Sequence, residues 1–311
     1  MDIPEKVRQI THNISRVLVG KGEATQLALI ALVCGGHVLI EDAPGLGKTT
    51  LALGLAQSLS CSLGRIQFTP DLLPSDITGF TMLDIQSGQR TLIPGGIMHQ
   101  LVLADEINRA SPKTQSALLE AMQENQVTVD GQTLPLPRPF MVLATQNPVE
   151  LAGVYPLPEA QRDRFLLRIH LGYPSAEEEM DILSRHQSAA QEPLSAVLTE
   201  ADVLALQAAL DTVTVADDVK GYIVQIAGAS RAASDIELPV SPRGSIALMR
   251  AAMAAALLSG RNYALPDDVQ RMAVPVLAHR LSLTPAARAA GHRAETVLGA
   301  LLQSVPAPRI P

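Results

Sequence analysis

The first half of the chain alternates short apolar runs with longer stretches whose apolar residues recur at helical spacing. The runs are apolar on both faces, which is typical of strands buried on both sides of a parallel sheet. The stretches between them predict helices that cover the two faces of this sheet. The pattern therefore predicts an α/β domain over residues 1–172, with strands at 37–40, 101–104, 140–144 and 165–169.

The pattern changes after residue 173. Ser175 is followed by Glu178 at the spacing of a capping box, which predicts the start of a helix. From there to the C-terminus strand signals are few and apolar residues recur at helical spacing. One of these helices is predicted to begin at Ser241, because a Pro follows this potential cap at the first helical position. We therefore expect a small, all-α second domain over residues 173–311.

Composition argues against two classes of protein, nucleic-acid-binding proteins and membrane-spanning proteins. The 311 residues carry a formal net charge of −7, and only 3% of them are aromatic. Nucleic-acid binding depends on Lys and Arg for phosphates and on aromatic rings for stacking, so both counts argue against such a partner. Cys34 and Cys61 are isolated, and we find neither a signal-peptide pattern nor an apolar stretch that could cross a bilayer. We expect a cytoplasmic protein without a membrane span.

A glycine-rich loop follows the first predicted strand and leads through Gly-Lys-Thr into a helical run. Gly45 and Gly47 let the backbone wrap closely around phosphate oxygens, and the helix N-terminus adds positive potential. Lys48 would reach the β- and γ-phosphates, and Thr49 would hold Mg²⁺. The alternative is a chance Gly-Lys-Thr, which the flanking strand and helix argue against. The residues expected to bind nucleotide are Ala43, Pro44, Gly45, Leu46, Gly47, Lys48, Thr49 and Thr50.

One position departs from the usual phosphate-loop pattern. Asp42 stands where the first glycine of the GxxxxGK[ST] motif is expected. A carboxylate aimed at the phosphates would repel them. We therefore predict that the Asp42 side chain points away from the nucleotide.

Acidic and polar residues follow two of the other predicted strands. Asp105 and Glu106 come directly after the strand 101–104, where ligands bind in sheets of this kind. Asp105 is predicted to hold Mg²⁺ through water, and Glu106 to orient and deprotonate the attacking water. Asn147 follows the strand 140–144 and is predicted to position that water. The alternatives are a helix cap for the acidic pair and an ordinary Asn-Pro turn.

Taken together, these motifs resemble those of the MoxR family of AAA+ ATPases, and the resemblance covers nearly the whole chain. The segment 39–50 is similar to the family's Walker A motif, in which Asp at position 42 is familiar. Four further segments resemble its Walker B region, sensor 1, arginine-finger segment and sensor 2: 104–115, 145–148, 155–165 and 241–243. The fold implied is an AAA+ core with a parallel sheet flanked by helices, followed by a small helical lid.

The resemblance assigns roles that spacing alone does not. Arg164 would be an arginine finger, donated across a subunit interface to a neighbour's γ-phosphate. Arg243 would contact the phosphates from the chain's own lid, with nucleotide between lid and core. Val19 and Gly20 would line the adenine pocket.

The arginine-finger segment leaves two alternatives open. Arg164 could instead form a surface ion pair with the adjacent Asp163. Arg162 also departs from the family pattern, which is usually apolar at that position. Because two arginines flank Asp163, Arg162 could share the finger's task.

The resemblance further implies Mg²⁺-dependent ATP hydrolysis by a ring, expected to be a hexamer. Hydrolysis would drive remodelling or activation of a partner protein. Partners of MoxR relatives are often von Willebrand factor A domain proteins, and some relatives help to insert metal cofactors. Two alternatives remain: a nucleic-acid translocase of the same helix-2-insert branch, and an ATP-dependent binding switch with little turnover. The acidic charge argues against the first, and Glu106 with Arg164 against the second.

Two hairpins are also expected. Residues 81–94 contain a turn at 87–89, and residues 127–134 contain Asp130-Gly131, a common hairpin turn. Both resemble the pore-facing hairpins of the helix-2-insert branch of AAA+ proteins. An ordinary surface hairpin is the alternative for each.

Overall fold

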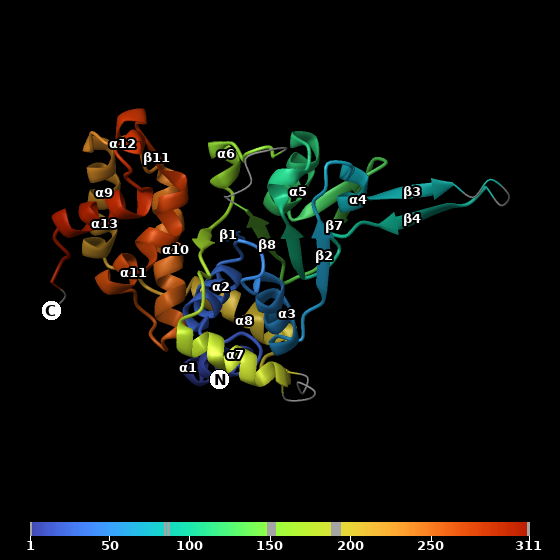
Figure 1. The fold of residues 1–311 in the computed structure, drawn as a ribbon, viewed down its shortest axis with the longest axis horizontal. Coiled ribbons are helices and arrows are strands. Elements are labelled where there is room, and N and C mark those ends of the chain that lie inside the picture. Colours follow the sequence, from blue (N-terminus) through green and yellow to red (C-terminus); the bar gives the residue numbers. More distant parts are fainter. Residues whose placement is uncertain (1, 84, 86–87, 148–153, 188–193, 310–311) are drawn as a thin grey trace.

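The computed structural model describes residues 2–83, 85, 88–147, 154–187 and 194–309. A five-stranded parallel sheet in the order β2-β5-β8-β1-β9 forms its centre (Figure 1). All four predicted strands are present, and the predicted α/β fold class is confirmed. The strands are β1 (Val38–Glu41), β2 (Leu63–Gln67), β5 (Leu101–Asp105), β8 (Met141–Gln146) and β9 (Leu167–Ile169).

Strand β2 was not predicted from the sequence. It forms one edge of the sheet and pairs only with β5. Gly64 and Ile66 are buried, whereas Arg65 and Gln67 between and after them are exposed. A strand with one solvated face alternates apolar and polar residues, so it lacks the continuous apolar run of the central strands.

Helices cover both faces of the sheet, as predicted. Alternate residues of β1 point to opposite faces, so that Val38 and Ile40 join one apolar cluster and Leu39 joins the other. The first cluster includes side chains of three helices, α1 (Ile3–Ser15), α2 (Gly22–Val33) and α3 (Lys48–Ser58). The second includes side chains of α4 (Pro74–Thr78) and α5 (Pro112–Glu124).

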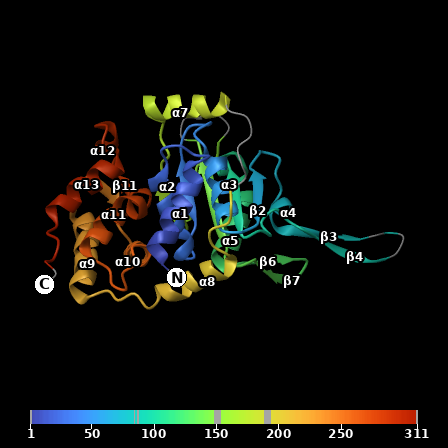
Figure 2. The ribbon, with the colours of Figure 1, turned by 90° about the horizontal axis from the view of Figure 1, so that it is seen from below.

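Both predicted hairpins are present. β3 (Gly79–Leu83) pairs with β4 (Arg90–Pro94), and β6 (Gln126–Val129) pairs with β7 (Gln132–Pro135), each antiparallel. The second turn is formed by Asp130 and Gly131, both with positive φ, as a two-residue hairpin loop requires. The β3–β4 hairpin extends away from the core (Figures 1 and 2). Ser87, which the sequence placed in its turn, lies outside the described residues.

The described C-terminal part of the chain is mainly helical and also contains a short antiparallel pair, β10 (Ile236–Leu238) with β11 (Ser282–Leu283). The predicted caps at Ser175 and Ser241 are both present. No helix within the described ranges is both long and apolar enough to cross a membrane. The helices are α7 (Ala176–Gln187), α8 (Glu200–Leu210), α9 (Asp217–Ala232), α10 (Pro242–Leu258), α11 (Pro266–Leu277), α12 (Pro285–Ala289) and α13 (Ala294–Ser304).

Helices α7 and α8 lie against the core, while α9 to α13 gather on one side of it (Figure 1). Arg185 of α7 donates to the backbone oxygens of Ser15 and Arg16 at 2.8 and 2.9 Å. Gln207 of α8 donates to the Leu32 oxygen at the end of α2, at 2.7 Å. The predicted division at residue 172 remains a prediction, although the helices that follow it directly are attached to the core.

Candidate active site

The loop between β1 and α3 has the backbone that phosphate binding requires. Gly45 and Gly47 have φ of 82° and 91°, a left-handed conformation that L-residues rarely adopt. A Cβ on Gly47 would also collide with the side chain of Leu18. The loop ends at Gly47, directly before the first residue of α3. The unpaired N–H groups at the start of this helix therefore point toward the loop.

Asp42 is accommodated by hydrogen bonds from the segment that follows β9, the strand next to β1. Its carboxylate accepts from the backbone N–H of Leu171 at 2.5 Å and of Gly172 at 3.3 Å. These residues follow β9. The carboxylate is thereby directed toward the end of β9, which agrees with the predicted orientation.

Lys48 occupies the centre of the site. Its Nζ donates to the backbone oxygen of Asp42 at 2.6 Å, closing the loop on itself. Burial lowers the pKa of the Lys48 amine, and the negative charges of Asp42, Asp105 and Glu106 oppose this shift. The amine of Lys48 therefore lies close enough to the carboxylates of Asp105 and Glu106 to interact with their charges.

Asp105 is held from two neighbouring strands. Thr145 at the end of β8 donates its hydroxyl to one carboxylate oxygen at 3.1 Å. Arg65 of β2 binds the other oxygen, with its Nε at 2.9 Å and a terminal nitrogen at 2.8 Å. Neither partner was predicted. Arg65 lies on the edge strand that the apolar pattern did not reveal, and Thr145 was noted only as part of a motif.

Glu106 has an unusual backbone, with φ of 56° in a residue that is not glycine. Such a conformation costs about 1–3 kcal/mol and is characteristic of functional sites. Its N–H donates to the Thr145 hydroxyl at 2.8 Å. Its carboxylate accepts from Gln67 at 3.1 Å and from Arg109 at 3.0 Å, at the end of the short 3₁₀ helix Ile107–Arg109. These contacts fix the position of the partly buried Glu106 carboxylate, and its role as the catalytic base stays a prediction.

The residues expected to hold Mg²⁺ fit a hard cation. The Thr49 side chain is exposed at the start of α3, and Asp105 presents a carboxylate at the same end of the sheet. Among the described residues, no group of three or more His, Cys, Asp or Glu side chains could hold a metal alone. A Mg²⁺ here would take its remaining ligands from phosphate oxygens and water. Thr49 and Asp105 remain predicted ligands.

Asn147, at the end of β8, is 95% buried. Val19 and Gly20 precede α2, close to the loop because Leu18 contacts Gly47. A Cβ on Gly20 would collide with the Glu178 carboxylate of α7, so this helix covers the predicted adenine pocket. Their predicted roles remain predictions, and Pro148 lies outside the described residues.

Arg164 lies near the start of β1, at the opposite end of this strand from the phosphate loop. It stands just before Leu166, whose N–H donates to the oxygen of His37 at 2.9 Å, where β1 begins. Its alternative role as a partner of Asp163 is not what the structure has, because that carboxylate pairs with Arg280 at 3.3 Å and with Arg243 at 3.6 Å. The Arg164 side chain is half-buried and forms no ion pair with the other described residues.

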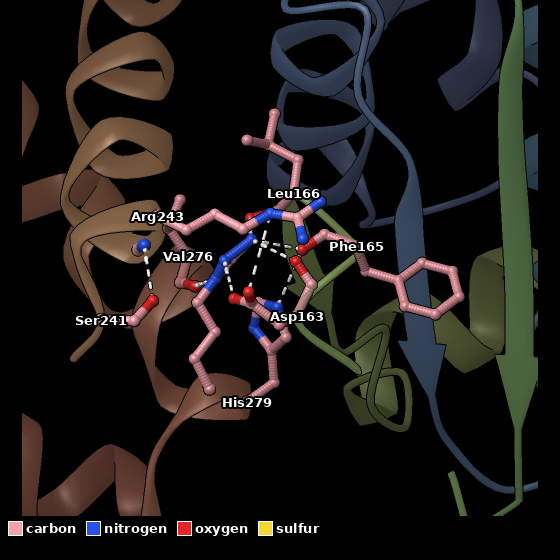
Figure 3. Close-up of polar contacts among 9 residues, drawn as sticks. Asp163, Phe165, Leu166, Ser241, Arg243, Val276 and His279 are labelled. Carbon is pink, nitrogen blue, oxygen red and sulfur yellow. Dashed lines mark hydrogen bonds and ion pairs between the residues drawn. The ribbon is translucent and has the colours of Figure 1, made fainter. Parts of the chain in front are cut away.

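The predicted contact between Arg243 and the chain's own phosphates is wrong. Its Nε lies 3.6 Å from the Asp163 carboxylate (Figure 3). Arg243 also lines a cavity of about 290 Å³ together with Arg164 and His37. His37 precedes β1 whereas the phosphate loop follows it, and four residues of strand span about 13 Å. The physical reason is that α10 packs on α2, and at this position the Arg243 side chain pairs with Asp163 beside Arg164.

Arg162 differs from Arg164 in its surroundings. It ends the short helix α6 (Glu159–Arg162), and its terminal nitrogen lies 3.9 Å from Glu159. Its Nε is buried without a hydrogen-bond partner among the described residues. This arginine thus points partly into the protein, and its share in the proposed finger role stays a prediction.

Comparison with known proteins agrees with this architecture. The family described as "ATPase family associated with various cellular activities (AAA)" matches residues 37–167, and the AAA lid domain matches residues 228–300. The chain is 40% identical over 306 residues to Chaperone MoxR1 of Mycobacterium tuberculosis, covering 96% of this chain and 81% of the relative.

Two further relatives match nearly end to end. The uncharacterized protein YeaC of Bacillus subtilis is 49% identical over 308 residues, which cover 99% of this chain and 96% of YeaC. A crystal structure of a candidate ATPase from Cytophaga hutchinsonii superposes with a TM-score of 0.91 at 37% identity. That match covers 99% of this chain and 96% of the other, so core and lid share one arrangement in both proteins.

Proposed function

This chain belongs to the MoxR family of AAA+ ATPases, and we propose that it hydrolyses Mg²⁺-bound ATP to remodel or activate a partner protein. One observation carries the catalytic part of this proposal. The amine of Lys48 lies within the electrostatic reach of Asp105 and Glu106, at the loop that β1 and α3 form. A phosphate-binding amine, a metal-binding carboxylate and a general base thus meet at one end of the sheet.

Each residue of this site has a separate task. Loop N–H groups and Lys48 bind the phosphates, with Lys48 exchanging the Asp42 oxygen for a phosphate oxygen. Thr49 and Asp105 hold Mg²⁺, which when bound neutralises developing charge on the phosphates. Glu106, positioned by Gln67 and Arg109, accepts a proton from the attacking water, and Asn147 helps to orient that water.

The site is completed by a second copy of the chain. Arg164 and Arg243 lie together near the start of β1, at the opposite end of this strand from the chain's own phosphate loop. Both therefore act in trans, on nucleotide bound to the adjacent subunit, where a guanidinium stabilises charge that develops in the transition state. Repeating this head-to-tail contact forms a ring, which we propose to be a hexamer.

The partner is proposed to be a protein. The relative named Chaperone MoxR1 supports this class of partner, and a von Willebrand factor A domain protein is the candidate we retain. The net charge of −7 disfavours nucleic acid. We propose the cytoplasm as the compartment, in agreement with two cysteines that are both free thiols.

Replacing the general base tests the proposed chemistry. Glu106→Gln keeps the size of the side chain but removes the proton acceptor. We expect ATP turnover to fall by about 100-fold or more, the usual contribution of a general base, while equilibrium binding of ATP is retained.

The matched control is Glu124→Gln at the exposed end of α5, which should hydrolyse ATP at the unmodified rate. Turnover would be measured as phosphate release and binding as fluorescence of a labelled nucleotide. Undiminished turnover in Glu106→Gln would show that the catalytic assignment is wrong.

A further inference from the structure

A buried arginine of the lid holds the finger segment from inside. Arg280 ends the 3₁₀ helix Ala278–Arg280 that follows α11, and it is only 8% exposed. One of its terminal nitrogens donates to the backbone oxygen of Phe165 at 2.6 Å and more weakly to those of Asp163 and Leu166, both at 3.4 Å. Its guanidinium thus binds three carbonyls around Arg164.

The carboxylate of Asp163 joins this arginine to the other one that faces the cavity. One oxygen of Asp163 accepts from Arg280 at 3.3 Å, and the other lies 3.6 Å from Arg243. Desolvation lowers the pKa of Arg280 to about 10, an effect that Asp163 opposes and Arg243 reinforces. Arg280 therefore remains charged at neutral pH and keeps its donors in place.

Neighbouring lid residues bind the same segment. His279 hydrogen-bonds through Nε2 to the oxygen of Phe165 at 3.1 Å, and Ser282 hydrogen-bonds to the carboxylate of Glu159. The lid segment 279–282 thus contacts the finger segment at two places, Glu159 and Phe165. A planar fork suits this task, because its donors reach several acceptors at fixed angles, which a lysine cannot do.

We propose that Arg280 is a positioning residue for catalysis in trans: by binding Asp163 and the backbone around Arg164, it aligns Arg164 and Arg243 toward the neighbouring subunit's nucleotide. The inference rests on the proposed function, since it needs those two arginines to act across an interface. The lid thereby governs hydrolysis in the next subunit rather than in its own.

Two substitutions test the role of Arg280. Arg280→Met removes the charge and the fork, and Arg280→Lys keeps the charge without the fork. A misplacement of about 1 Å can cost about 100-fold in rate, so we expect turnover to fall by about that factor in Arg280→Met, with the KM for ATP nearly unchanged. Arg280→Lys should recover part of the loss.

Arg288→Met on α12 is the matched control, because Arg288 is exposed and lies 4.0 Å from its only described ionic partner, Glu237. It should retain full activity. Arg164→Ala serves as the comparator whose lost group belongs to the finger itself, with an expected loss of about 1,000-fold.

Mixed assemblies separate positioning from a defect in folding. Each Arg280 variant is co-expressed with Glu106→Gln chains, which cannot hydrolyse ATP but carry an intact finger edge. We expect turnover in these mixtures well above the sum of the two separate proteins, because the intact finger serves the variant's own sound nucleotide site. Arg164→Ala should be rescued by Glu106→Gln in the same way.

The outcomes are distinguishable. Rescue of Arg164→Ala without rescue of either Arg280 variant would overturn the positioning role while leaving the trans arrangement intact. Unchanged turnover in Arg280→Met would also overturn it. Full activity of Arg164→Ala alone, or failure of its mixture to recover, would overturn the proposed function instead. If Arg280→Met does not fold, the same comparison is decided by Arg280→Lys.

Discussion

At the scale of single residues, His37 shows how one buried side chain connects three elements. Its Nδ1 accepts from the N–H of Val142 in β8 at 3.1 Å, so Nε2 carries the proton and donates to the oxygen of Met122 in α5 at 3.0 Å. Burial lowers the pKa of His37 to about 4. The imidazole is therefore neutral, and its tautomer is set by the backbone.

This residue predicts a pH dependence of stability. The pKa of His37 is about 4 in the folded chain and 6.5 in an exposed histidine, so the unfolded state binds the proton first. The stabilisation is complete above pH 6.5 and is lost as the pH falls through 4, by at most about 3 kcal/mol. His37→Asn should flatten this part of the profile. The free energy of unfolding would be measured in urea at pH 7 and at pH 4.5. If the prediction is wrong, the decrease between these pH values would be the same in the unmodified chain and in His37→Asn.

At the scale of elements, capping residues and apolar runs were read correctly from the sequence. Ser241 begins α10, and its hydroxyl accepts from the N–H of Gly244 at 3.2 Å. Edge strand β2 was missed because its alternating pattern carries a weaker signal. One partner each of Asp105 and Glu106 was missed with it, since Arg65 and Gln67 are on that strand. Local signals thus predict elements better than the contacts between them.

The cap of α10 makes a testable contribution. Ser241→Ala removes the acceptor for one N–H of the first helical turn, and we expect a loss of about 1 kcal/mol in the free energy of unfolding. The control is Ser184→Ala in the exposed interior of α7, where Ala favours the helix. Denaturant unfolding would measure both. Equal stability of the two variants would show that the Ser241 hydroxyl contributes nothing.

At the scale of the whole molecule, the sequence predicted the two architectural parts but not how they pack. Arg243 was expected at the chain's own phosphates, whereas the lid holds it beside Asp163. No local pattern could reveal this, because the position of the lid depends on long-range contacts such as that between Arg280 and Phe165. The proposed catalytic groups of one chain are accordingly divided between the two opposite ends of the strands.

This division predicts that turnover depends on assembly. A single chain holds Lys48 and Glu106 at its nucleotide site, but its own Arg164 and Arg243 lie at the opposite end of the strands. ATP turnover per chain should therefore rise with protein concentration, by up to about 1,000-fold between monomer and ring. Dilution series with particle mass measured in parallel would check this. A constant rate per chain down to the monomer would contradict it.

The placement of Arg164 and the phosphate loop at opposite ends of β1 also gives the molecule a polarity. In an open assembly of copies joined end to end, Arg164 and Arg243 of one terminal subunit face no nucleotide site. The nucleotide site at the other end receives no arginine from a neighbour. An arc of any length thus always contains one idle pocket, and only closure makes all pockets equal. If the position of an opening in the ring moves from one interface to the next, the nucleotide site without arginines moves with it.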